Sequence, residues 1–482
     1  MTVERERSTG AELRRRALRS AAASFRRQPV EAWIVAGVVT ALYSVFSIAQ
    51  WNRFDTPSWD LGIFTQLAKA YAGLNAPIVP IKGHEFNLLG DHFHPLLVVL
   101  GPVYALFPSG LTLLILQNVL IGFSAFVITR LAVRHIGRSG GLFLGAAYGV
   151  SWGVQAAVAV QFHEIALALP LLALALEAYL DGRLRTAVVT AGLLVFVKED
   201  LGLTVLAFGL VLAWRFRRHY KVGLGLAVWG LAWMVLSVAL ILPALNTGGT
   251  YDYADRIDIG ALLRDPVNTL FIMLTAPEKY ETLWLLLLAG GFLFLRSPLA
   301  LLMVPTLLWR FAAGNEFYWG PDWHYNAVLM PILFAALVDA ILAARRSRRT
   351  WLRSYSAAVV PVVSVVALML LPNQPLGTLA KPETLAQSPR WDAAHRLMDS
   401  IPQGSTVETG VGLMPYLVPE TEVYWIGNEN PPPDYLIVDA DDWSWGPVRP
   451  SSAEQHAEDT WPGENYTLVF EEAGYQLVKR DG

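Results

Sequence analysis

Acidic and histidine side chains occur in short polar segments that interrupt an otherwise apolar sequence. Asp55 and Asp60 follow the first long apolar run, and further candidates lie near the ends of later runs. These candidates lie in the motifs GDHFHP, QFHE, KED and NEFYWGPDWHYN, and one arginine lies just before the last motif. They are His92, His94, His163, Glu164, Lys198, Glu199, Asp200, Arg310, His324 and Tyr325. Carboxylates and imidazoles can transfer protons, and lysine or arginine can neutralise a phosphate. These residue types suit acid–base chemistry beside a phosphate.

Each motif also has a simpler interpretation. Asp60 can cap the helix expected over LGIFTQLAKAYAG, because Asp is a favoured N-cap residue. The charged side chains of the KED turn can form a local ion-pair cluster. A His-x-His pair can orient a phosphate or bind a divalent cation, for which Asp60, His92, His94 and His163 are the candidate ligands. The residues alone leave these alternatives open.

Aromatic residues accompany the last of these motifs. NEFYWGPDWHYN combines Glu316, Asp322 and His324 with five aromatic residues. Trp and Tyr are common at membrane surfaces, but flat aromatic faces next to carboxylates also suit a sugar ring, with its apolar C–H faces and rim of hydroxyls. The basic residues near predicted helix ends that can hold a lipid phosphate are Arg53, Arg256, Lys279 and Arg310.

The composition indicates a membrane protein. The 482 residues are 54% hydrophobic and only 16% charged, with a mean hydropathy of +0.40. Cysteine is absent, which excludes disulfides, thiolate metal sites and cysteine nucleophiles. No GxxxxGKS/T or HExxH motif occurs, so ATP use is not expected. We expect membrane lipids as partners and no nucleic acid.

Apolar runs predict eleven membrane-spanning helices, since about 20 helical residues cross a bilayer. The runs begin near Val30, Leu111, Gly140, Ile165, Arg185, Leu201, Val222, Glu281, Pro298, Ala327 and Ser354. If the breaks at KED (198–200) and RSP (296–298) are turns, 23 Lys and Arg lie on the side of the amino terminus and 14 on the other. An excess of basic residues marks the cytoplasmic side. The candidate site residues then lie in outer connections, facing away from the cytoplasm.

The sequence therefore predicts three regions. Residues 1–29 form a basic cytoplasmic segment, and residues 30–372 form an all-α, multi-spanning membrane domain with a large first outer loop at 51–110. Residues 373–482 are polar and predict a small extracytoplasmic α/β domain that contacts the acceptor or packs on the helices. Its short strands are expected around Thr406, Val423, 435–438, 467–470 and 475–478.

An ordered set of motifs adds a resemblance to these inferences. DLGIF, HFHP, FHE, KED and WHYNAVLMPILFAAL resemble the bacterial membrane proteins of the domain of unknown function 2079 family, from about Trp51 to Ala340. That family is similar to the C-type glycosyltransferases, multi-spanning enzymes that take sugars from polyprenyl phosphates. The resemblance implies a catalytic acidic residue in the first outer loop, which is Asp60 here, with Asp55 as the near alternative. The extended DxD-like signature of some members is absent.

The expected function is transfer of a sugar, with inversion, from a polyprenyl-phosphate donor to a glycan, lipid or protein acceptor at the outer face of the bacterial plasma membrane. An outer site has no nucleotide sugar, so an activated sugar must arrive on a lipid. Asp60 would act as general base, a histidine would assist or bind metal, and Lys198 or Arg310 would neutralise the departing phosphate. A lipid or glycan transporter or flippase, which needs polar residues near the bilayer midplane, and a non-catalytic envelope-assembly scaffold are the alternatives.

Overall fold

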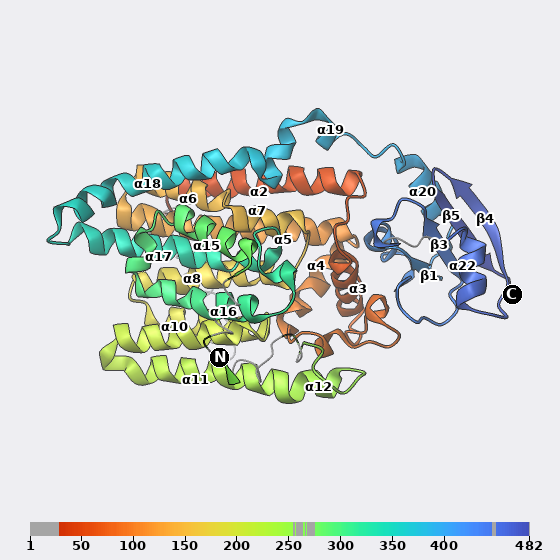
Figure 1. Ribbon diagram of the computed structural model, residues 1–482, viewed down its shortest axis with the longest axis horizontal. Helices are drawn as coiled ribbons and strands as arrows, with labels where there is room; N and C mark the ends of the chain where they lie inside the picture. The colour runs from red at the N-terminus through yellow and green to blue at the C-terminus, as the bar shows by residue number, and fades with distance from the viewer. Residues whose placement is uncertain are drawn as a thin grey trace, which may run out of the picture.

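The computed structural model describes residues 28–445 and 450–481, except for residues 254–255, 257–263, 266 and 268–274. The arginine-rich part of the predicted cytoplasmic segment lies outside the described residues. It includes Arg14, Arg15, Arg16, Arg19, Arg26 and Arg27. Figure 1 shows a bundle of long helices and, at one end of it, a small sheet with its own helices.

Apolar helices form at each of the eleven expected positions. They are α2 (Val30–Asn52), α5 (Gly110–Ile136), α6 (Arg138–Gly149) with α7 (Trp152–Ala159), α8 (Ala168–Leu180), α9 (Leu184–Gly192), α10 (Leu201–Arg215), α11 (Tyr220–Leu236) with α12 (Leu242–Leu245), α15 (Pro277–Ala289), η10 (Pro298–Met303) with α16 (Val304–Ala312), α17 (Leu329–Arg345) and α18 (Thr350–Leu370). Within the described ranges, six helical segments are long and apolar enough to cross a membrane, and four shorter apolar helices accompany them.

The two uncertain breaks in the apolar pattern are both turns. The 3-10 segment η5 (Leu193–Phe196) ends just before KED, and α10 begins just after it. At RSP, Ser297 is extended between η9 (Leu293–Arg296) and η10, and its hydroxyl donates to Asp339 Oδ2 over 2.6 Å. The expectation of two short helices at each break is confirmed.

The first loop after α2 folds into short helices that carry the acidic motif. These are α3 (Asp60–Ala72), η1 (Pro80–Lys82), η2 (Leu88–Gly90), η3 (Pro95–Val99) and α4 (Leu100–Leu106). Asp60 is the first residue of α3, and Trp59 occupies the N-cap position. The interpretation of Asp60 as the N-cap is therefore wrong, because its carboxylate lies beyond the position from which a side chain caps the first turn.

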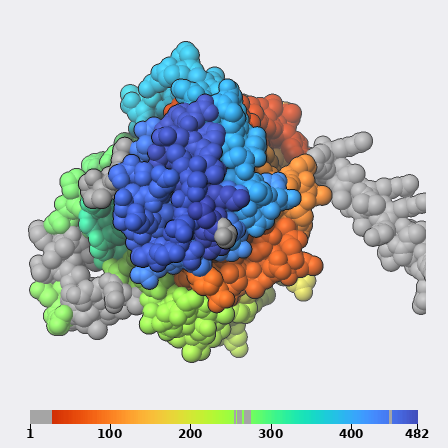
Figure 2. Space-filling model, turned by 90° about the vertical axis from the view of Figure 1, so that its right-hand side faces the viewer, coloured from red at the N-terminus to blue at the C-terminus, as the bar shows by residue number. Residues whose placement is uncertain are grey.

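The carboxy-terminal region forms a five-stranded sheet of order β2-β1-β3-β5-β4. Its strands are β1 (Thr406–Thr409), β2 (Glu422–Trp425), β3 (Tyr435–Asp439), β4 (Tyr466–Glu472) and β5 (Tyr475–Arg480), and its helices are α19 (Pro382–Leu385), α20 (Trp391–Asp399), α21 (Met414–Leu417) and α22 (Ala453–Thr460). β1 is parallel to β2 and β3, whereas β5 is antiparallel to β3 and β4. The five expected strands are confirmed. Figure 2 shows this domain in blue over one end of the bundle, bordered by the first loop in orange.

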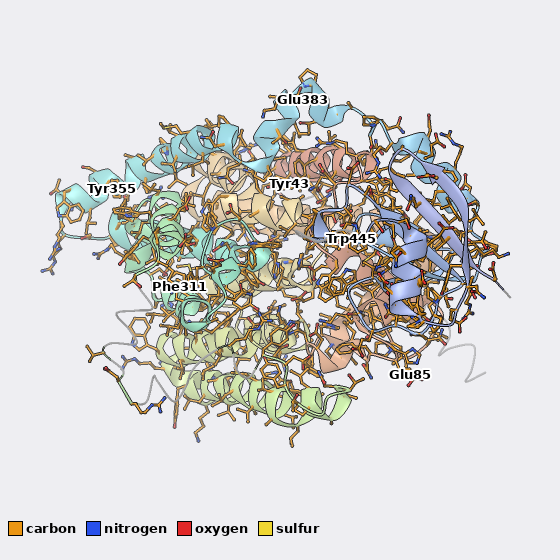
Figure 3. All side chains as sticks on the ribbon, turned by 45° about the vertical axis from the view of Figure 1, so that its right-hand side comes forward. Tyr43, Glu85, Phe311, Tyr355, Glu383 and Trp445 are labelled. Atoms are coloured by element: carbon orange, nitrogen blue, oxygen red, sulfur yellow. The ribbon has the colours of Figure 1, made fainter. Side chains whose placement is uncertain are left out.

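A cluster of arginines occupies the other end of the bundle. Arg130 and Arg183 bond to the fully buried carboxylate of Glu177 over 2.6 and 2.9 Å, and Arg134 also contacts it. These arginines come from α5 and the α8–α9 turn, so the structure brings basic clusters that are far apart in sequence to one end. In Figure 3, Tyr355 lies at the end away from the sheet, whereas Trp445 lies within the sheet domain.

Glycines allow α10 and α11 to pack closely. A Cβ atom on Gly209 would lie 2.4 Å from the backbone nitrogen of Ala227 and 2.6 Å from the carbonyl oxygen of Gly223. Only hydrogen fits between the two helices at this point. Because α10 begins directly after KED, this contact also fixes where KED lies relative to α11.

We expect Gly209→Ala to lower the free energy of unfolding by about 1–3 kcal/mol, because the new methyl group meets backbone that cannot move aside. Gly225→Ala is the matched control: it adds the same methyl group to α11 at a position with no atom within 4 Å. Thermal unfolding of the two variants in the same detergent compares them directly. Equal midpoints would contradict the packing argument.

Candidate functional site

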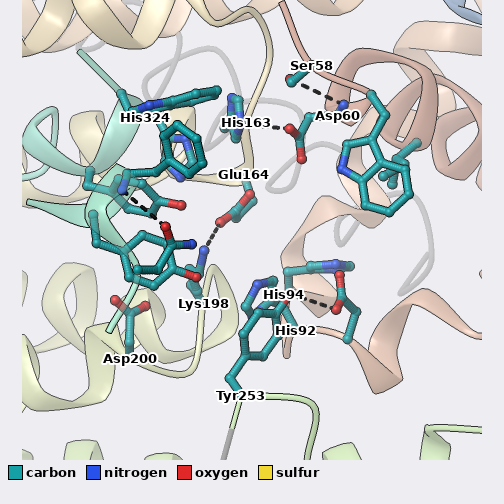
Figure 4. A pocket seen from close by; sticks show the side chains of 18 of the residues that line it. Ser58, Asp60, His92, His94, His163, Glu164, Lys198, Asp200, Tyr253 and His324 are labelled. Carbon is teal, nitrogen blue, oxygen red and sulfur yellow. Dashed lines mark hydrogen bonds and ion pairs between the residues drawn. The ribbon is translucent and has the colours of Figure 1, made fainter. Parts of the chain in front are cut away.

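A cavity of about 990 Å³ lies at the end of the bundle that the sheet domain covers. It gathers candidates from five separate stretches of chain (Figure 4). The predicted site residues that line it are Asp60, His92, His94, His163, Glu164, Lys198, Glu199, Asp200, His324 and Tyr325. Residues up to 265 positions apart in sequence therefore share one site, from Asp60 to Tyr325.

Asp60 forms an ion pair with His163 on one side of the cavity. His163 Nε2 lies 3.4 Å from Asp60 Oδ2, and its Nδ1 donates to the carbonyl of Gln161 over 3.2 Å. The His324 ring stacks on His163 at 3.8 Å between centroids. Gln161 holds this tight turn with a positive φ of 72°, a strained conformation for a residue other than glycine. The turn therefore directs Nε2 of His163 toward the Asp60 carboxylate.

The pKa values of this pair favour its charged form. Burial disfavours the Asp60 carboxylate, but the charge and hydrogen bond of His163, with help from Ser58 and Lys82, outweigh burial and lower the pKa of Asp60 to about 2. Burial likewise opposes protonation of His163, yet Asp60 raises the pKa of His163 above its ordinary value. Asp60 is thus ionised near neutral pH and able to accept a proton.

A second acid–histidine pair lies on another wall of the cavity. His92 Nδ1 donates to Glu199 Oε1 over 2.7 Å, and the backbone N–H of Phe93 donates to Glu199 Oε2 over 3.0 Å. The Tyr253 ring stacks on His92 at 4.6 Å, and its hydroxyl donates to Asp91. Burial and Lys198 oppose protonation of His92, but Glu199 and Asp91 raise its pKa overall. This wall therefore presents an imidazolium over a wider pH range than a free histidine does.

A buried ion pair lies between the two walls. Lys198 Nζ donates to Glu164 Oε1 over 2.6 Å. Burial disfavours the Glu164 carboxylate, but Lys198 and the nearby histidines lower its pKa well below the ordinary value. Asp200 differs from it, because burial dominates and raises its pKa to about 6. Burial also lowers the pKa of His94 to about 4, so His94 is neutral near pH 7.

Two predicted site residues do not line the cavity. Asp55 pairs with Arg53 over 3.1 Å, and its side chain is 50% exposed. Arg310 is fully buried and donates to the carbonyl oxygens of Tyr318 and Gly320 and to Asn326 Oδ1. Its hydrogen bonds hold the 315–326 segment in place. Of the two predicted catalytic acids, the structure therefore leaves Asp60 at the cavity, where Asp91 from the same loop also lies.

No group of three or more His, Cys, Asp or Glu in the described part of the chain has a geometry that could hold a metal ion. The candidate ligands Asp60 and His163 pair with each other, while His92 pairs with Glu199. The arrangement does not fit a divalent cation, and no step of the chemistry below runs through one.

Several lining residues were not among the predicted site residues. Lys82 forms an ion pair with Asp91 over 3.3 Å, and Tyr253 reaches the cavity from the connection after α12. Further lining residues of this kind are Trp59, Tyr251, Trp425 and Trp443. Arg256, which the sequence indicates as a possible ligand of a lipid phosphate, also lines the cavity. The combination of aromatic and basic residues in YDYADR (251–256) is the signal that could have identified Tyr251 and Tyr253.

The ion pair between Asp60 and His163 gives the stability of the protein a pH dependence. Because the pKa of His163 is raised in the folded state, its contribution to stability is complete below about pH 6.5. That contribution is lost as the pH rises through the folded-state pKa. Asp60 contributes above 3.8 and loses its contribution as the pH falls toward about 2. We expect the thermal unfolding midpoint of wild type to exceed that of His163→Gln at pH 5 to 6. The difference between the two midpoints is expected to decrease toward pH 9. A difference that is constant across this range would contradict the assignment.

The fold is similar to two solved structures of ArnT from Cupriavidus metallidurans. The structure bound to undecaprenyl phosphate has a TM-score of 0.51 at 12% identity and covers 93% of this chain and 98% of that one. The apo structure has a TM-score of 0.52 at 14% identity, over 92% and 97% of the two chains. The apo Archaeoglobus fulgidus oligosaccharyltransferase has a TM-score of 0.41 at 12% identity, over 84% and 70%. The likeness to ArnT is one of fold, and it agrees with the C-type glycosyltransferase-like fold expected from the sequence.

Sequence comparison identifies the family of the chain. No curated protein matches it. The family described as "Predicted membrane protein (DUF2079)" matches residues 51–477, a range that includes every residue lining the cavity. The protein that carries this acid- and histidine-lined cavity on an ArnT-like fold is a member of the DUF2079 family of membrane proteins.

Proposed function

We propose that the protein transfers a sugar from a polyprenyl-phosphate donor to an acceptor hydroxyl at the extracytoplasmic face of the membrane, with inversion at the anomeric carbon. The observation that carries this proposal is the double character of the cavity. Leu203 from α10, Met234 from α11 and Val238, which follows α11, line the cavity with apolar side chains, and the two acid–histidine pairs line it with charged ones. A donor with a hydrocarbon chain and a charged sugar phosphate matches both surfaces.

The apolar wall includes a local departure from α-helical geometry. The segment η7 (Ser237–Ile241), between α11 and α12, is a π-helix, and Val238 from this segment lines the cavity. Short π-helical segments frequently mark functional sites. ArnT, whose fold is similar, was solved with undecaprenyl phosphate bound, which supports a lipid phosphate as the donor.

The chemistry follows from the residues of the two walls. Asp60 accepts the proton of the acceptor hydroxyl while the acceptor oxygen attacks the anomeric carbon. The bond between that carbon and the phosphate oxygen breaks, and its electron pair leaves with the polyprenyl phosphate. Lys198 and the protonated His92 stabilise the negative charge that develops on the phosphate. His163 orients the Asp60 carboxylate through the 3.4 Å contact.

The orientation in the membrane is part of this proposal. The described basic clusters of α5 and the α8–α9 turn lie at the end opposite to the cavity, and basic residues favour the cytoplasmic side. The candidate groups gather at one end of the bundle rather than at its middle, which argues for an enzyme over a transporter.

Because the chain has no cysteine, single cysteines can test the orientation. A membrane-impermeant maleimide added to intact cells is expected to label Gln403→Cys, an exposed position before β1, but not Arg348→Cys, an exposed position between α17 and α18. Labelling of both positions after permeabilisation is the control. The reverse pattern would place the cavity on the cytoplasmic side.

The activity test uses the full chain in proteoliposomes with polyprenyl phosphates that carry radiolabelled hexoses or pentoses. We expect label to pass to an envelope glycan or glycolipid fraction, with polyprenyl phosphate as the second product and inverted configuration at the new bond. Movement of the intact labelled lipid across the bilayer without transfer would identify a flippase instead and refute the proposal.

A further inference from the structure

We propose that the cavity contains a separate acceptor subsite for a saccharide ring, built by Trp59 from the first loop with Trp425 and Trp443 from the sheet domain. This inference rests on the proposed function and names the class of acceptor. All three tryptophans line the cavity together with Asp60. The sheet domain is thereby a part of the site and supplies the surface that selects the acceptor.

Two of the tryptophans form a fixed corner. The rings of Trp59 and Trp425 lie edge to face, 4.6 Å apart at 67°. Trp425 ends β2 and folds back over Gly427, where a Cβ atom would lie 2.5 Å from the indole ring. Asn428 donates to the carbonyl of Ile81 over 2.9 Å and ties this turn to the first loop. The corner is therefore positioned before any ligand binds.

The third tryptophan offers a free face. Trp443 is 59% exposed although it lines the cavity. Its indole N–H donates to the carbonyl of Thr56 over 2.9 Å, which fixes the ring across the domain boundary. The preceding Asp442 carboxylate accepts from the backbone N–H groups of Gly412 and Ser444 and holds the turn. An exposed aromatic ring that is anchored at its nitrogen is suited to stacking.

The chemistry of this corner fits a sugar better than a peptide or an acyl chain. A saccharide ring packs its C–H faces on indole and keeps hydroxyls at its rim, and Trp59 directly precedes Asp60, so a ring held there brings a hydroxyl to the base. A peptide could add to the edge strand β2, which Trp425 ends, but that strand is followed by a turn that is bonded to the first loop. The surface that suits an acyl chain is the separate helical wall of Leu203, Met234 and Val238.

The test measures binding of sugars alone to the full-length protein in detergent. The probe is an array of defined soluble pyranose and furanose oligosaccharides that carry neither lipid nor phosphate. We expect wild type to bind at least one class, and Trp443→Ala to weaken that binding tenfold or more. Gly427→Ala is expected to weaken it as well, because the methyl group displaces the Trp425 ring without removing an indole.

The control variant is Trp214→Ala, which removes a tryptophan of the same 59% exposure on α10, outside the cavity, and is expected to bind like wild type. Unchanged binding in Trp443→Ala and Gly427→Ala, or wild-type binding of peptides or sugar-free lipids but no saccharide, would overturn the subsite. Tryptophan-dependent saccharide binding by a protein that transfers no sugar would support the subsite and refute the proposed function.

Discussion

Asp60→Asn is expected to lower the rate of sugar transfer by about 10²–10⁴-fold, the range that general-base catalysis contributes. Asparagine has nearly the same shape as aspartate but cannot take the proton of an acceptor hydroxyl near neutral pH. The Asp60 carboxylate is ionised there, because His163 lowers its pKa to about 2 against the effect of burial. The measurement is release of polyprenyl phosphate from a labelled donor in proteoliposomes.

Asp55→Asn provides a matched control for this variant. It makes the same change five residues earlier in the same loop, but the Asp55 side chain is 50% exposed, pairs with Arg53 and does not line the cavity. We expect its transfer rate to equal that of wild type. Full transfer activity in Asp60→Asn would show that Asp60 is not the general base, whatever the activity of Asp55→Asn. Thermal unfolding of both variants separates loss of chemistry from loss of folding.

The helices were predictable because apolar runs, and the polar breaks between them, can be identified directly in the sequence. KED and RSP could be identified as turns by counting basic residues, and the structure places a helix start after each of them. The strands of the sheet were predictable from short alternating runs such as those at Thr406 and Val423. In both cases the signal is local, since it needs only neighbours within one element.

Most of the charged and histidine side chains of the cavity were also predictable, because such residues in tight turns have few structural reasons to be there. His163 and Glu164 occupy a short turn, and both line the cavity. Arg310 has the same sequence signature, a basic residue at a helix end, yet its guanidinium bonds inward to Asn326 and two carbonyl oxygens. Whether such a residue binds a ligand or its own chain depends on the fold of the segment opposite to it, which the sequence pattern does not encode.

The residues that the sheet domain contributes to the cavity could not be predicted. Trp443 joins the first loop through a hydrogen bond to Thr56, a residue 387 positions earlier. Nothing in the spacing near Trp425 or Trp443 differs from that of a surface loop. Contacts of this range follow from how two domains dock, and docking is determined by the complete surfaces of both.

Lys198→Met is expected to lower the free energy of unfolding by about 3–5 kcal/mol, the cost of leaving one partner of a buried ion pair without compensation. Lys198 and Glu164 are 11% and 3% exposed in their side chains, and they lie 2.6 Å apart. Without the ammonium group, the Glu164 carboxylate loses the partner that contributes most to its lowered pKa and must take up a proton or draw water inward. Reversible unfolding in SDS, followed by tryptophan fluorescence, measures the loss.

The double variant Lys198→Met/Glu164→Gln is the decisive comparison for this pair. Replacing both charges leaves no unpaired ion, so we expect the double variant to recover most of the stability that the single variant loses. Its transfer rate should nevertheless stay low, because Lys198 also stabilises the departing phosphate. Equal destabilisation of the single and double variants would mean that the methionine disturbs packing rather than charge balance. Recovery of stability without recovery of activity would separate the structural role of Lys198 from its role in the transfer reaction.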